Sequence, residues 1–546
     1  MRKVIFPSAK IVAVDMQNMG KLPAIIYPVD QRAMIEFFME YYFDNDRADV
    51  FEIVTYEAHQ KVIGFLPRSE KIRVSKLDEL RDLGYTVYWG LRQADLHEGD
   101  TIIINFPDVM LLEPEGELSK DCCYYADESP SSKWSYFEDA DGVFTEIYDH
   151  SPSEAIRSRK MFIGVFGITK PLLLMQMLAD SLQAEGECGV DSFYEALKNY
   201  SKRCPMRMVK TEDWFDIGHI ERYYDAQLAI KSRTFNHIAI DKNRGILTKT
   251  SEDKAKLINE IKWYLKLPAD IEYLRPRIFS YSLDYENPYV RMEYYAYHTL
   301  HELFLYGDLE EKHWYSIFRR IKFILQDMGR YTVSDENVGV SLLEVYMSKT
   351  ISRMEKVMVK GLGELDFSKP LIVNGVCYRS WREIMEILPN VINRRLMACS
   401  EFSIIHGDLC FTNVLVDQNY SFVKCVDPRG SFGKFDIYGD RRYEYAKLMH
   451  SVEGKYDYII RDLFTIETRG NRIDYRFQDR QKDADVLKVF LDVFNDEISG
   501  NMDEIKLLEA MLFLSMIPLH EESLKHQLLM MSTGLRLLGE VEDIVC

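Results

Sequence analysis

The pattern of apolar residues changes near residue 231, and this change constrains the fold more than any other feature of the sequence. Before it, short β-branched runs such as "VFEIVT" (50–55) are separated by segments with helical spacing, as in "RAMIEFFMEYY" (32–42). After it, helical periodicity dominates. A chain of 546 residues is also too long for a single hydrophobic core. We therefore expect two domains, 1–230 and 231–546.

The first domain is predicted to be α/β with a mostly parallel sheet, because strands that alternate with helices form βαβ units. The expected strands are "KIVAV" (10–14), "VFEIVT" (50–55), "YTVYW" (85–89), "TIIIN" (101–105) and "MFIGVFGI" (161–168). Helices are expected at 32–42, at 75–84 and from Pro171, and 138–149 is expected to be a loop that enters a strand.

The second domain is predicted to begin with a β hairpin and to continue as helices. The segment "FNHIAIDKNRGILTKTS" (235–251) is typical of two antiparallel strands joined by a turn at Asn243-Arg244-Gly245. Amphipathic helical spacing follows, most clearly at 313–329 and 484–498.

The composition excludes several classes of partner. The formal net charge of -19 argues against a nucleic-acid backbone or an anionic membrane as the partner, because both need a basic surface. The nine cysteines show neither a CxxC pair nor zinc-ligand spacing, as expected for reduced thiols. There is no signal-peptide pattern, and the longest apolar stretch, 511–519, is too short to span a membrane. We expect a cytoplasmic protein that acts on a small-molecule substrate, with an oligomeric state that the sequence leaves open.

The stretch "HGDLCFTNVLVD" (406–417) carries the residue types that phosphoryl transfer needs. Transfer of a γ-phosphoryl group to an alcohol needs a carboxylate at the hydroxyl proton and oxygen ligands for Mg²⁺. Asp408 can point at the acceptor hydroxyl, and Asn413 can turn its amide oxygen toward the metal. Asp427 follows an apolar strand, where a second metal ligand belongs.

The same chemistry needs a lysine, held by a glutamate, to grip the nucleotide phosphates. The sequence puts Lys249 on a predicted strand and Glu260 on the helix that follows it. Each residue has a common alternative when taken singly: a surface Lys, a surface Glu, an Asp that caps a turn, and a His406 that only holds the loop. The order along the chain, strand Lys, helix Glu, H-G-D-x4-N and strand Asp, favours a phosphotransferase.

Residues from about 235 to 540 resemble the aminoglycoside phosphotransferase/choline kinase family of small-molecule kinases. The resemblance continues in "YGDRRYEYAKL" (438–448), where Glu444 stands at a position that is commonly Asp in the family. It implies an α+β, bilobal protein-kinase-like fold that uses ATP and Mg²⁺ to phosphorylate a hydroxyl of an amino alcohol, amino acid or sugar. The roles it implies are catalytic base for Asp408, Mg²⁺ ligands for Asn413 and Asp427, and phosphate-gripping pair for Lys249 and Glu260.

The segment "VRMEYY" (290–295) resembles the interlobe hinge of that family, so Glu293 and Tyr294 are expected to contact adenine. The acceptor is less defined. One candidate is an aromatic site for a cationic head group, with ordinary core packing as the alternative. Its residues would be Tyr294, Tyr295, Tyr297 and Trp381.

The first domain resembles the sugar-1-phosphate nucleotidyltransferases, a Rossmann-like family. The matching segments are "GKLPAIIYPVDQRAMIEFF" (20–38), "DTIIINFPDV" (100–109) and "EDWFDIGHIERYYDAQ" (212–227). The resemblance implies that Asp108 and Asp216 bind a metal. It leaves the nucleotide open, with CTP and UTP as candidates.

The phosphate-binding part of the first domain departs from that family. Its glycine-rich loop, whose N–H groups would cradle a triphosphate, is replaced by "VAVDMQNMGKLP" with the single glycine Gly20. Ala24 stands in the signature Lys position, although Lys21 and Lys10 are close in sequence. Either the domain is a divergent but active nucleotidyltransferase, or it has kept the fold and lost the activity.

Three functional hypotheses follow. In the first, a kinase is fused to a nucleotidyltransferase-like domain that converts the phosphorylated product to a nucleotide-activated precursor of a surface polysaccharide. In the second, the kinase carries an inactive N-terminal domain. In the third, the protein is a scaffold that binds a nucleotide sugar.

Overall fold

The chain folds into two compact units, Met1–Lys231 (unit 1) and Ser232–Cys546 (unit 2). The computed structural model describes residues 1–66, 69–112, 118–129, 131, 133–149, 156–184, 192–234, 237–478 and 485–546. Cys188, residues 235 and 236 of the predicted hairpin and residue 484 of a predicted helix lie outside these ranges. The cysteines within them are free thiols. Among the described helices, none combines the length and apolar composition needed to cross a bilayer.

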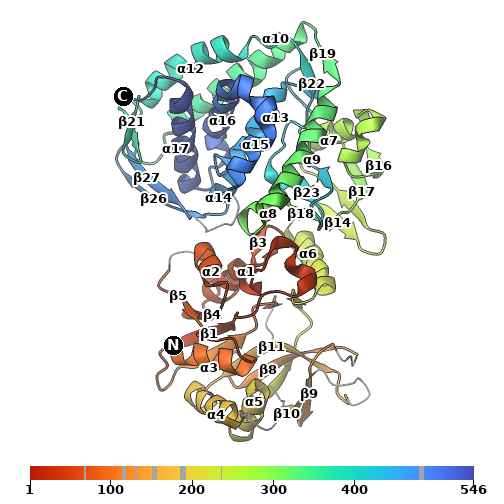
Figure 1. The fold of residues 1–546 in the computed structure, drawn as a ribbon, viewed down its shortest axis with the longest axis vertical. Helices are drawn as coiled ribbons and strands as arrows, with labels where there is room; N and C mark the ends of the chain where they lie inside the picture. The colour runs from red at the N-terminus through yellow and green to blue at the C-terminus, as the bar shows by residue number, and fades with distance from the viewer. Residues whose placement is uncertain are drawn as a thin grey trace. The chain divides into compact units, whose positions relative to one another are not determined.

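Unit 1 is built on a mixed sheet that, within the described residues, has nine strands in the order β5-β4-β1-β6-β11-β8-β12-β10-β9 (Figure 1). The strands are β1 (Arg2–Pro7), β4 (Val50–Thr55), β5 (Ile72–Lys76), β6 (Thr101–Asn105), β8 (Cys122–Asp127), β9 (Tyr136–Ala140), β10 (Val143–Tyr148), β11 (Lys160–Ile168) and β12 (Arg207–Lys210). Two short ladders join β2 (Pro28–Val29) to β3 (Arg32–Ala33) and β7 (Val109–Leu111) to β13 (Trp214–Asp216). The predicted α/β class of this unit is confirmed.

The sheet is not mostly parallel. The strands β5, β4, β1 and β6 form the expected parallel block and β12 pairs in parallel with β8, but β11 runs antiparallel to β6 and β8, and β10 runs antiparallel to β9 and β12. The segment 138–149, predicted as a loop, is the hairpin of β9 and β10. Its turn residues Asp141 and Gly142 have φ values of 51° and 76°, which suit a tight hairpin turn. A connection this short joins antiparallel strands, whereas parallel strands need a long crossover.

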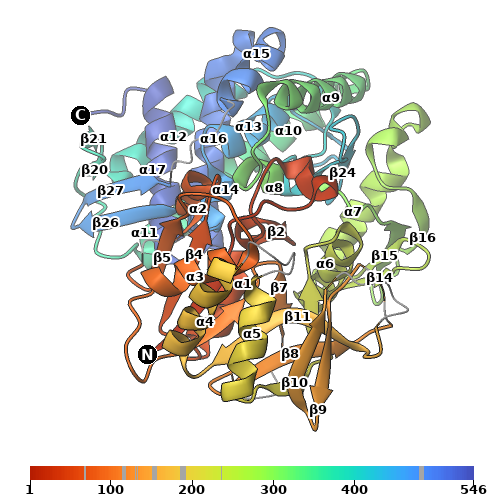
Figure 2. The ribbon, with the colours of Figure 1, turned by 60° about the horizontal axis from the view of Figure 1, so that its bottom comes forward.

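Three helices cover one face of the unit 1 sheet and form its core with it. The helices of the unit are α1 (Met34–Met39), α2 (His59–Phe65), α3 (Leu83–Gln93), α4 (Pro171–Ala184), α5 (Ser192–Arg203) and α6 (Ile220–Thr234). Figures 1 and 2 show α3, α4 and α5 together on one side of the sheet, with α4 and α5 side by side. Buried residues of these helices, such as Val87, Leu178 and Phe193, pack in one cluster with Ile104 and Phe166 of the sheet.

The helix predicted at 75–84 and the strand predicted at 85–89 are both wrong. The observed helix is α3, Leu83–Gln93, which begins only at the end of the first segment and contains the whole of the second. The Asp82 side chain accepts a hydrogen bond from the Tyr85 backbone N–H at 2.9 Å and so caps this helix. A Cβ on Gly84 would lie 2.6 Å from the backbone nitrogen of Phe193, so the glycine lets α3 approach α5 closely. The cap and this tertiary packing outweigh the β propensity of the aromatic and β-branched residues.

The strand predicted at 10–14 is also wrong. The first strand of the sheet is β1, which pairs with β4 and β6. In the 10–14 segment only Ile11 forms a β bridge, to Pro23, and Val14 is 85% exposed. Residues Val14–Met19 form a 3₁₀ helix instead. The backbone partner of this run is the 22–23 segment, to which the Val12 N–H donates at 2.9 Å, and no strand of the described sheets pairs with it.

Unit 2 begins with an antiparallel sheet in the order β14-β15-β17-β16. Its elements are β14 (Ile238–Asp241), β15 (Ile246–Lys249), helix α7 (Lys254–Lys266), β16 (Ile278–Ser282) and β17 (Tyr289–Glu293). The predicted hairpin is therefore confirmed over β14 and β15.

The rest of unit 2 is mainly helical (Figure 1). Its helices are α8 (Leu300–Leu305), α9 (Glu311–Gly329), α10 (Asn337–Leu342), α11 (Lys349–Lys360), α12 (Trp381–Leu396), α13 (Arg441–Val452), α14 (Tyr456–Ile460), α15 (Val486–Ile498), α16 (Met502–Met516) and α17 (Leu524–Val541). Its strands are β18 (His298–Thr299), β19 (Thr332–Val333), β20 (Leu371–Val373), β21 (Val376–Tyr378), β22 (Phe402–Ile404), β23 (Val414–Val416), β24 (Val423–Cys425), β25 (Tyr438–Gly439), β26 (Phe464–Arg469) and β27 (Arg472–Phe477). The helices expected at 313–329 and 484–498 correspond to α9 and α15.

Candidate active sites

The loop between β22 and β23 brings Asp408 and Asn413 together in unit 2. Gly407 has a φ of 78°, which turns the chain sharply just before Asp408. The Asn413 side-chain amide donates to the Asp408 backbone carbonyl at 2.9 Å and lies 3.4 Å from its carboxylate. Because the NH₂ end of Asn413 is fixed in this way, the amide oxygen is the end that remains for a ligand.

Buried groups behind this loop fix its shape. Glu444 of α13 is fully buried, and its carboxylate accepts hydrogen bonds from the backbone N–H groups of His406 (3.0 Å) and Gly407 (2.8 Å). Burial raises the pKa of Glu444 to about 7. The His406 ring donates through Nε2 to the Val426 carbonyl at 3.0 Å, and burial lowers its pKa to about 4, so the ring is neutral. Both residues hold the loop in position.

Lys249, Glu260 and Asp427 form one ion triad. The Lys249 Nζ lies 2.9 Å from Glu260 Oε2 and 2.6 Å from Asp427 Oδ1. Burial disfavours the charge of Lys249, but the two carboxylates outweigh it and raise the pKa of the ammonium group. Burial, followed by the charge of Asp427, raises the pKa of Glu260 to about 7. The predicted phosphate-gripping pair thus contacts a predicted metal ligand.

Asp427 is held next to Asn413 by the backbone. The Val426 N–H donates to the Asn413 carbonyl at 3.0 Å, and the Asp427 N–H donates to the Tyr264 hydroxyl at 3.0 Å. Asp427 itself has a φ of 58°. Its carboxylate is 52% exposed, whereas Glu260 is 4% exposed, so Asp427 is the member of the triad that a ligand can reach.

Lys447 is a partner of Asp408 that the motif did not reveal. Its Nζ lies 2.9 Å from Asp408 Oδ1, and only 11% of its side chain is exposed. Burial opposes the charge of Asp408, but Lys447 outweighs this effect and keeps the pKa of Asp408 below its ordinary value. Lys447 follows Glu444 by one turn of α13, so it could have been suspected only from the helical spacing of that segment.

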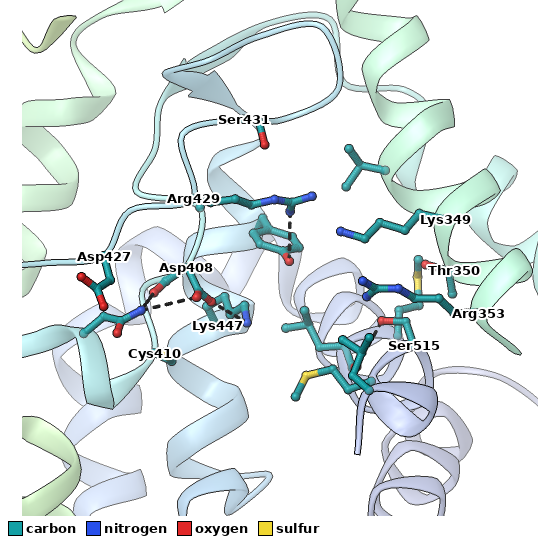
Figure 3. Close-up of a pocket in the computed structure, with 18 of the residues that line it drawn as sticks. Lys349, Thr350, Arg353, Asp408, Cys410, Asp427, Arg429, Ser431, Lys447 and Ser515 are labelled. Carbon is teal, nitrogen blue, oxygen red and sulfur yellow. Dashed lines mark hydrogen bonds and ion pairs between the residues drawn. The ribbon is translucent and has the colours of Figure 1, made fainter. Parts of the chain in front are cut away.

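Asp408, Asn413 and Asp427 line one cavity of about 810 Å³. Figure 3 shows the carboxylates of Asp427 and Asp408 on the same wall, with Lys447 beside Asp408. The opposite side carries Lys349 and Arg353, and Arg429 reaches toward them from the loop that follows Asp427 (Figure 3). Leu508, Met511 and Leu512 of α16 supply an apolar part of the lining.

The predicted hinge and aromatic residues lie apart from this cavity lining. The backbone N–H of Glu293 donates to the Arg277 carbonyl and that of Tyr294 to the Gly245 carbonyl, so both N–H groups already have partners. The adenine contact of this segment stays a prediction. Tyr295 donates to the Glu293 carboxylate at 2.7 Å and packs against Tyr297. Trp381 is fully buried against Phe367. The core-packing alternative therefore describes Trp381, and none of the four predicted aromatic residues is among those that line the described cavity.

Unit 1 brings its two predicted metal ligands together. The antiparallel pair β7 and β13 places Asp216 opposite Val109, the residue after Asp108. A Cβ on Gly218 would lie 2.7 Å from Asp108 Oδ2 and 3.0 Å from Asp216 Oδ1, so both carboxylates converge on this glycine. Burial and the charge of Asp216 raise the pKa of Asp108 to about 7. The His219 ring lies 3.2 Å from Asp216.

The segment that replaces the glycine-rich loop carries an acidic group. Asp15, in the 3₁₀ helix Val14–Met19, lines a cavity of about 240 Å³ together with Trp134, His219 and Arg222. The Tyr27 hydroxyl donates toward this helix, 2.9 Å from the Met16 carbonyl. Lys10 and Lys21 are exposed, and Ala24 is buried. Neither lysine is among the residues that line the described cavity.

No protein-family model and no curated protein matches the chain. Solved structures similar to its N-terminal part include a UDP-glucose pyrophosphorylase, at 16% sequence identity, covering 43% of this chain and 100% of that one, with a TM-score of 0.34. A CTP:phosphocholine cytidylyltransferase from Streptococcus pneumoniae is 15% identical, over 42% of this chain and 99% of that one, with a TM-score of 0.34. An inositol-1-phosphate CTP transferase from T. maritima is 14% identical, over 42% and 96%, with a TM-score of 0.31. Likeness at this level carries no inference about activity, which rests on the side chains.

The role of Glu444 as the anchor of the Asp408 loop is testable. Glu444→Gln leaves one acceptor oxygen for two buried N–H groups and should lower the free energy of unfolding of unit 2 by about 1–3 kcal/mol. Urea denaturation at pH 8, where the wild-type carboxyl is ionised, measures this change. The matched control is Glu355→Gln, which makes the same substitution at an exposed position of α11. Equal stability of the two variants would contradict the anchoring role.

Proposed function

We propose that unit 2 is an ATP- and Mg²⁺-dependent kinase that phosphorylates a hydroxyl group of a small molecule. The observation that carries the proposal is the convergence of Asp408, Asn413 and Asp427 on one cavity, with Lys249 held by Glu260 against Asp427. These are the residue types that phosphoryl transfer requires, and they come from segments up to 178 positions apart in the sequence.

Asp408 is positioned to act on the acceptor hydroxyl. Its carboxylate is 38% exposed to the cavity, and Lys447 keeps it ionised at neutral pH. As the hydroxyl oxygen forms a bond to the γ-phosphorus, the bond from that phosphorus to the β–γ bridging oxygen breaks and ADP leaves. The hydroxyl proton passes to Asp408. The acceptor thereby becomes a phosphomonoester.

Asn413 and Asp427 fit a Mg²⁺ ion. Both offer oxygen donors, which this hard cation prefers, and the amide of Asn413 is already oriented by its bond to Asp408. When bound with ATP, the ion would neutralise charge on the phosphate oxygens. The buried ammonium group of Lys249 can neutralise phosphate charge as well, because it can donate hydrogen bonds to phosphate oxygens instead of to Asp427.

A substitution at the base should separate binding from turnover. We expect Asp408→Asn to retain ATP binding while lowering turnover by about 10²-fold or more, since a positioned base contributes about 10²–10⁴. ADP formation at saturating acceptor measures the effect. Asp543→Asn, at a carboxylate that is 92% exposed, is the matched control. Wild-type turnover in the Asp408 variant would exclude it as the base.

The two proposed metal ligands should contribute unequally to Mg²⁺-dependent ATP binding. Asp427→Ala should weaken Mg²⁺-dependent ATP binding more than Asn413→Ala, because a carboxylate brings a full charge to the cation and an amide only a dipole. Calorimetric titration with MgATP, and with ATP in the presence of a chelator, measures the difference. Equal losses, or the reverse order, would contradict these roles.

We further propose that unit 1 binds a divalent metal at Asp108 and Asp216 and acts on the phosphomonoester that unit 2 makes. In that reaction a phosphate oxygen of the phosphomonoester attacks the α-phosphorus of a nucleoside triphosphate such as CTP or UTP, and pyrophosphate leaves. The specific support is the convergence of the two carboxylates on Gly218. The acidic Asp15 and the missing signature Lys predict weak triphosphate binding and slow transfer with ordinary hexose 1-phosphates.

Release of pyrophosphate tests this second activity. The full-length protein is supplied with the product of unit 2, Mg²⁺ and each nucleoside triphosphate in turn. Release that disappears in both Asp108→Ala and Asp216→Ala would establish a bifunctional enzyme that makes a nucleotide-activated precursor. If no nucleotide gives pyrophosphate release, the second activity is contradicted, and the protein is a kinase with a structural or scaffolding N-terminal unit.

A further inference from the structure

The cavity of unit 2 contains three basic side chains that the kinase chemistry does not use. Lys349 and Arg353 extend from α11, and Arg429 follows β24. Figure 3 shows their cationic ends directed toward the same space, away from the wall that carries Asp427. None of the three forms an ion pair with a residue that the structure describes. The polar contact of Arg429 is with the Tyr443 hydroxyl, at 3.4 Å.

This arrangement is unfavourable unless an anion occupies the cavity. Burial, together with the charges of Arg429 and Arg353, lowers the pKa of Lys349 to about 7. Burial and Arg429 also lower the pKa of Arg353. Elsewhere in the same cavity the buried Lys447 is paired with Asp408. Asp408 attracts Lys349 and Arg429 through its charge, but its ion pair is with Lys447, and no carboxylate among the described residues forms an ion pair with any of the three cations. The missing negative charge is therefore expected from a ligand.

The position of the cluster separates it from the nucleotide phosphates. The lysine proposed to grip those phosphates, Lys249, lies in the β sheet and contacts Asp427. Lys349 and Arg353 lie on a helix that follows α9 and α10, near the apolar residues Leu508 and Leu512 of α16 that line the same cavity. In Figure 3 Asp408 lies between Asp427, the residue that Lys249 contacts, and the side chains of Lys349 and Arg353.

We propose that Lys349, Arg353 and Arg429 form an anion-binding subsite for the acceptor, which is a small alcohol that also carries a carboxylate or a phosphate group. This inference rests on the proposed kinase function. The guanidinium forks of the two arginines match the paired oxygens of either anion, and Asp408 faces the hydroxyl of the same molecule. A cationic head group, one of the acceptors that the sequence left open, would be repelled by the two arginines and by the protonated form of Lys349.

Ligand-induced stabilisation of the full-length protein tests this subsite. The probes are D-glycerate and sn-glycerol 3-phosphate, with glycerol and choline as neutral and cationic counterparts at equal ionic strength, all in saturating MgADP. A ligand that binds only the folded state raises the melting temperature. We expect a rise with at least one of the two anions and none with glycerol or choline; which anion is stronger identifies carboxylate or phosphate as the preferred group.

Three variants make the test specific. Lys349→Gln and Arg353→Gln should each raise the half-saturating anion concentration by about 10-fold or more. Lys356→Gln, which removes the same charge from an exposed position of α11, should leave it unchanged. The subsite is overturned if neither anion stabilises the wild type, if choline or glycerol stabilises it more, or if the Lys356 variant behaves like the other two.

Nucleotide binding distinguishes this inference from the kinase proposal. MgADP alone should stabilise the wild type and all three variants equally. Loss of that stabilisation in the Lys349 or Arg353 variant would assign these cations to the nucleotide and overturn the acceptor subsite. If MgADP stabilises no form of the protein while an anion still does, the kinase proposal fails and the anion site stands by itself.

Discussion

The contact of Lys249 with Glu260 and Asp427 is the interaction on which the unit 2 site depends. It joins the β sheet, helix α7 and the loop after β24 at one point. A buried ammonium group without carboxylate partners would be strongly destabilising, so the three segments are held together by a shared electrostatic requirement. When both carboxylates are ionised, the triad carries one negative charge more than it needs for neutrality. That surplus makes it complementary to a divalent cation, and it leaves the exposed carboxylate of Asp427 on the cavity side.

Acidic and basic side chains occupy different parts of the cavity. Asp427 and Asp408 line one wall, and Lys349, Arg353 and Arg429 form a basic region beyond them. The acidic wall suits a metal and a hydroxyl proton, whereas the basic region suits an anionic part of the acceptor. The buried Glu444 and neutral His406 keep the Asp408 loop rigid between the two. The polarity of the cavity therefore favours one orientation of an acceptor that has a hydroxyl at one end and a negative charge at the other.

The sequence predicted those parts of the site that lie within short motifs. Asp408 and Asn413 are five positions apart, and Lys249 and Glu260 belong to a strand and the helix after it, so local spacing was sufficient. Lys447 lies on α13, Lys349 and Arg353 lie on α11, and Arg429 follows β24, so tertiary packing brings these four side chains to one cavity. In unit 1 the β propensity of residues 85–89 was misleading, because the Asp82 cap and the close approach at Gly84 favour helix α3. Long-range packing of this kind leaves no periodic trace in the chain.

A crystal structure of the protein with Mg²⁺ and a non-hydrolysable ATP analogue tests the kinase account most directly. We expect the metal to contact Asp427 and the amide oxygen of Asn413. We also expect the Lys249 ammonium group to contact a phosphate of the nucleotide while it keeps Glu260 as its partner. A nucleotide bound away from this cavity, or a metal that contacts neither Asn413 nor Asp427, would contradict it.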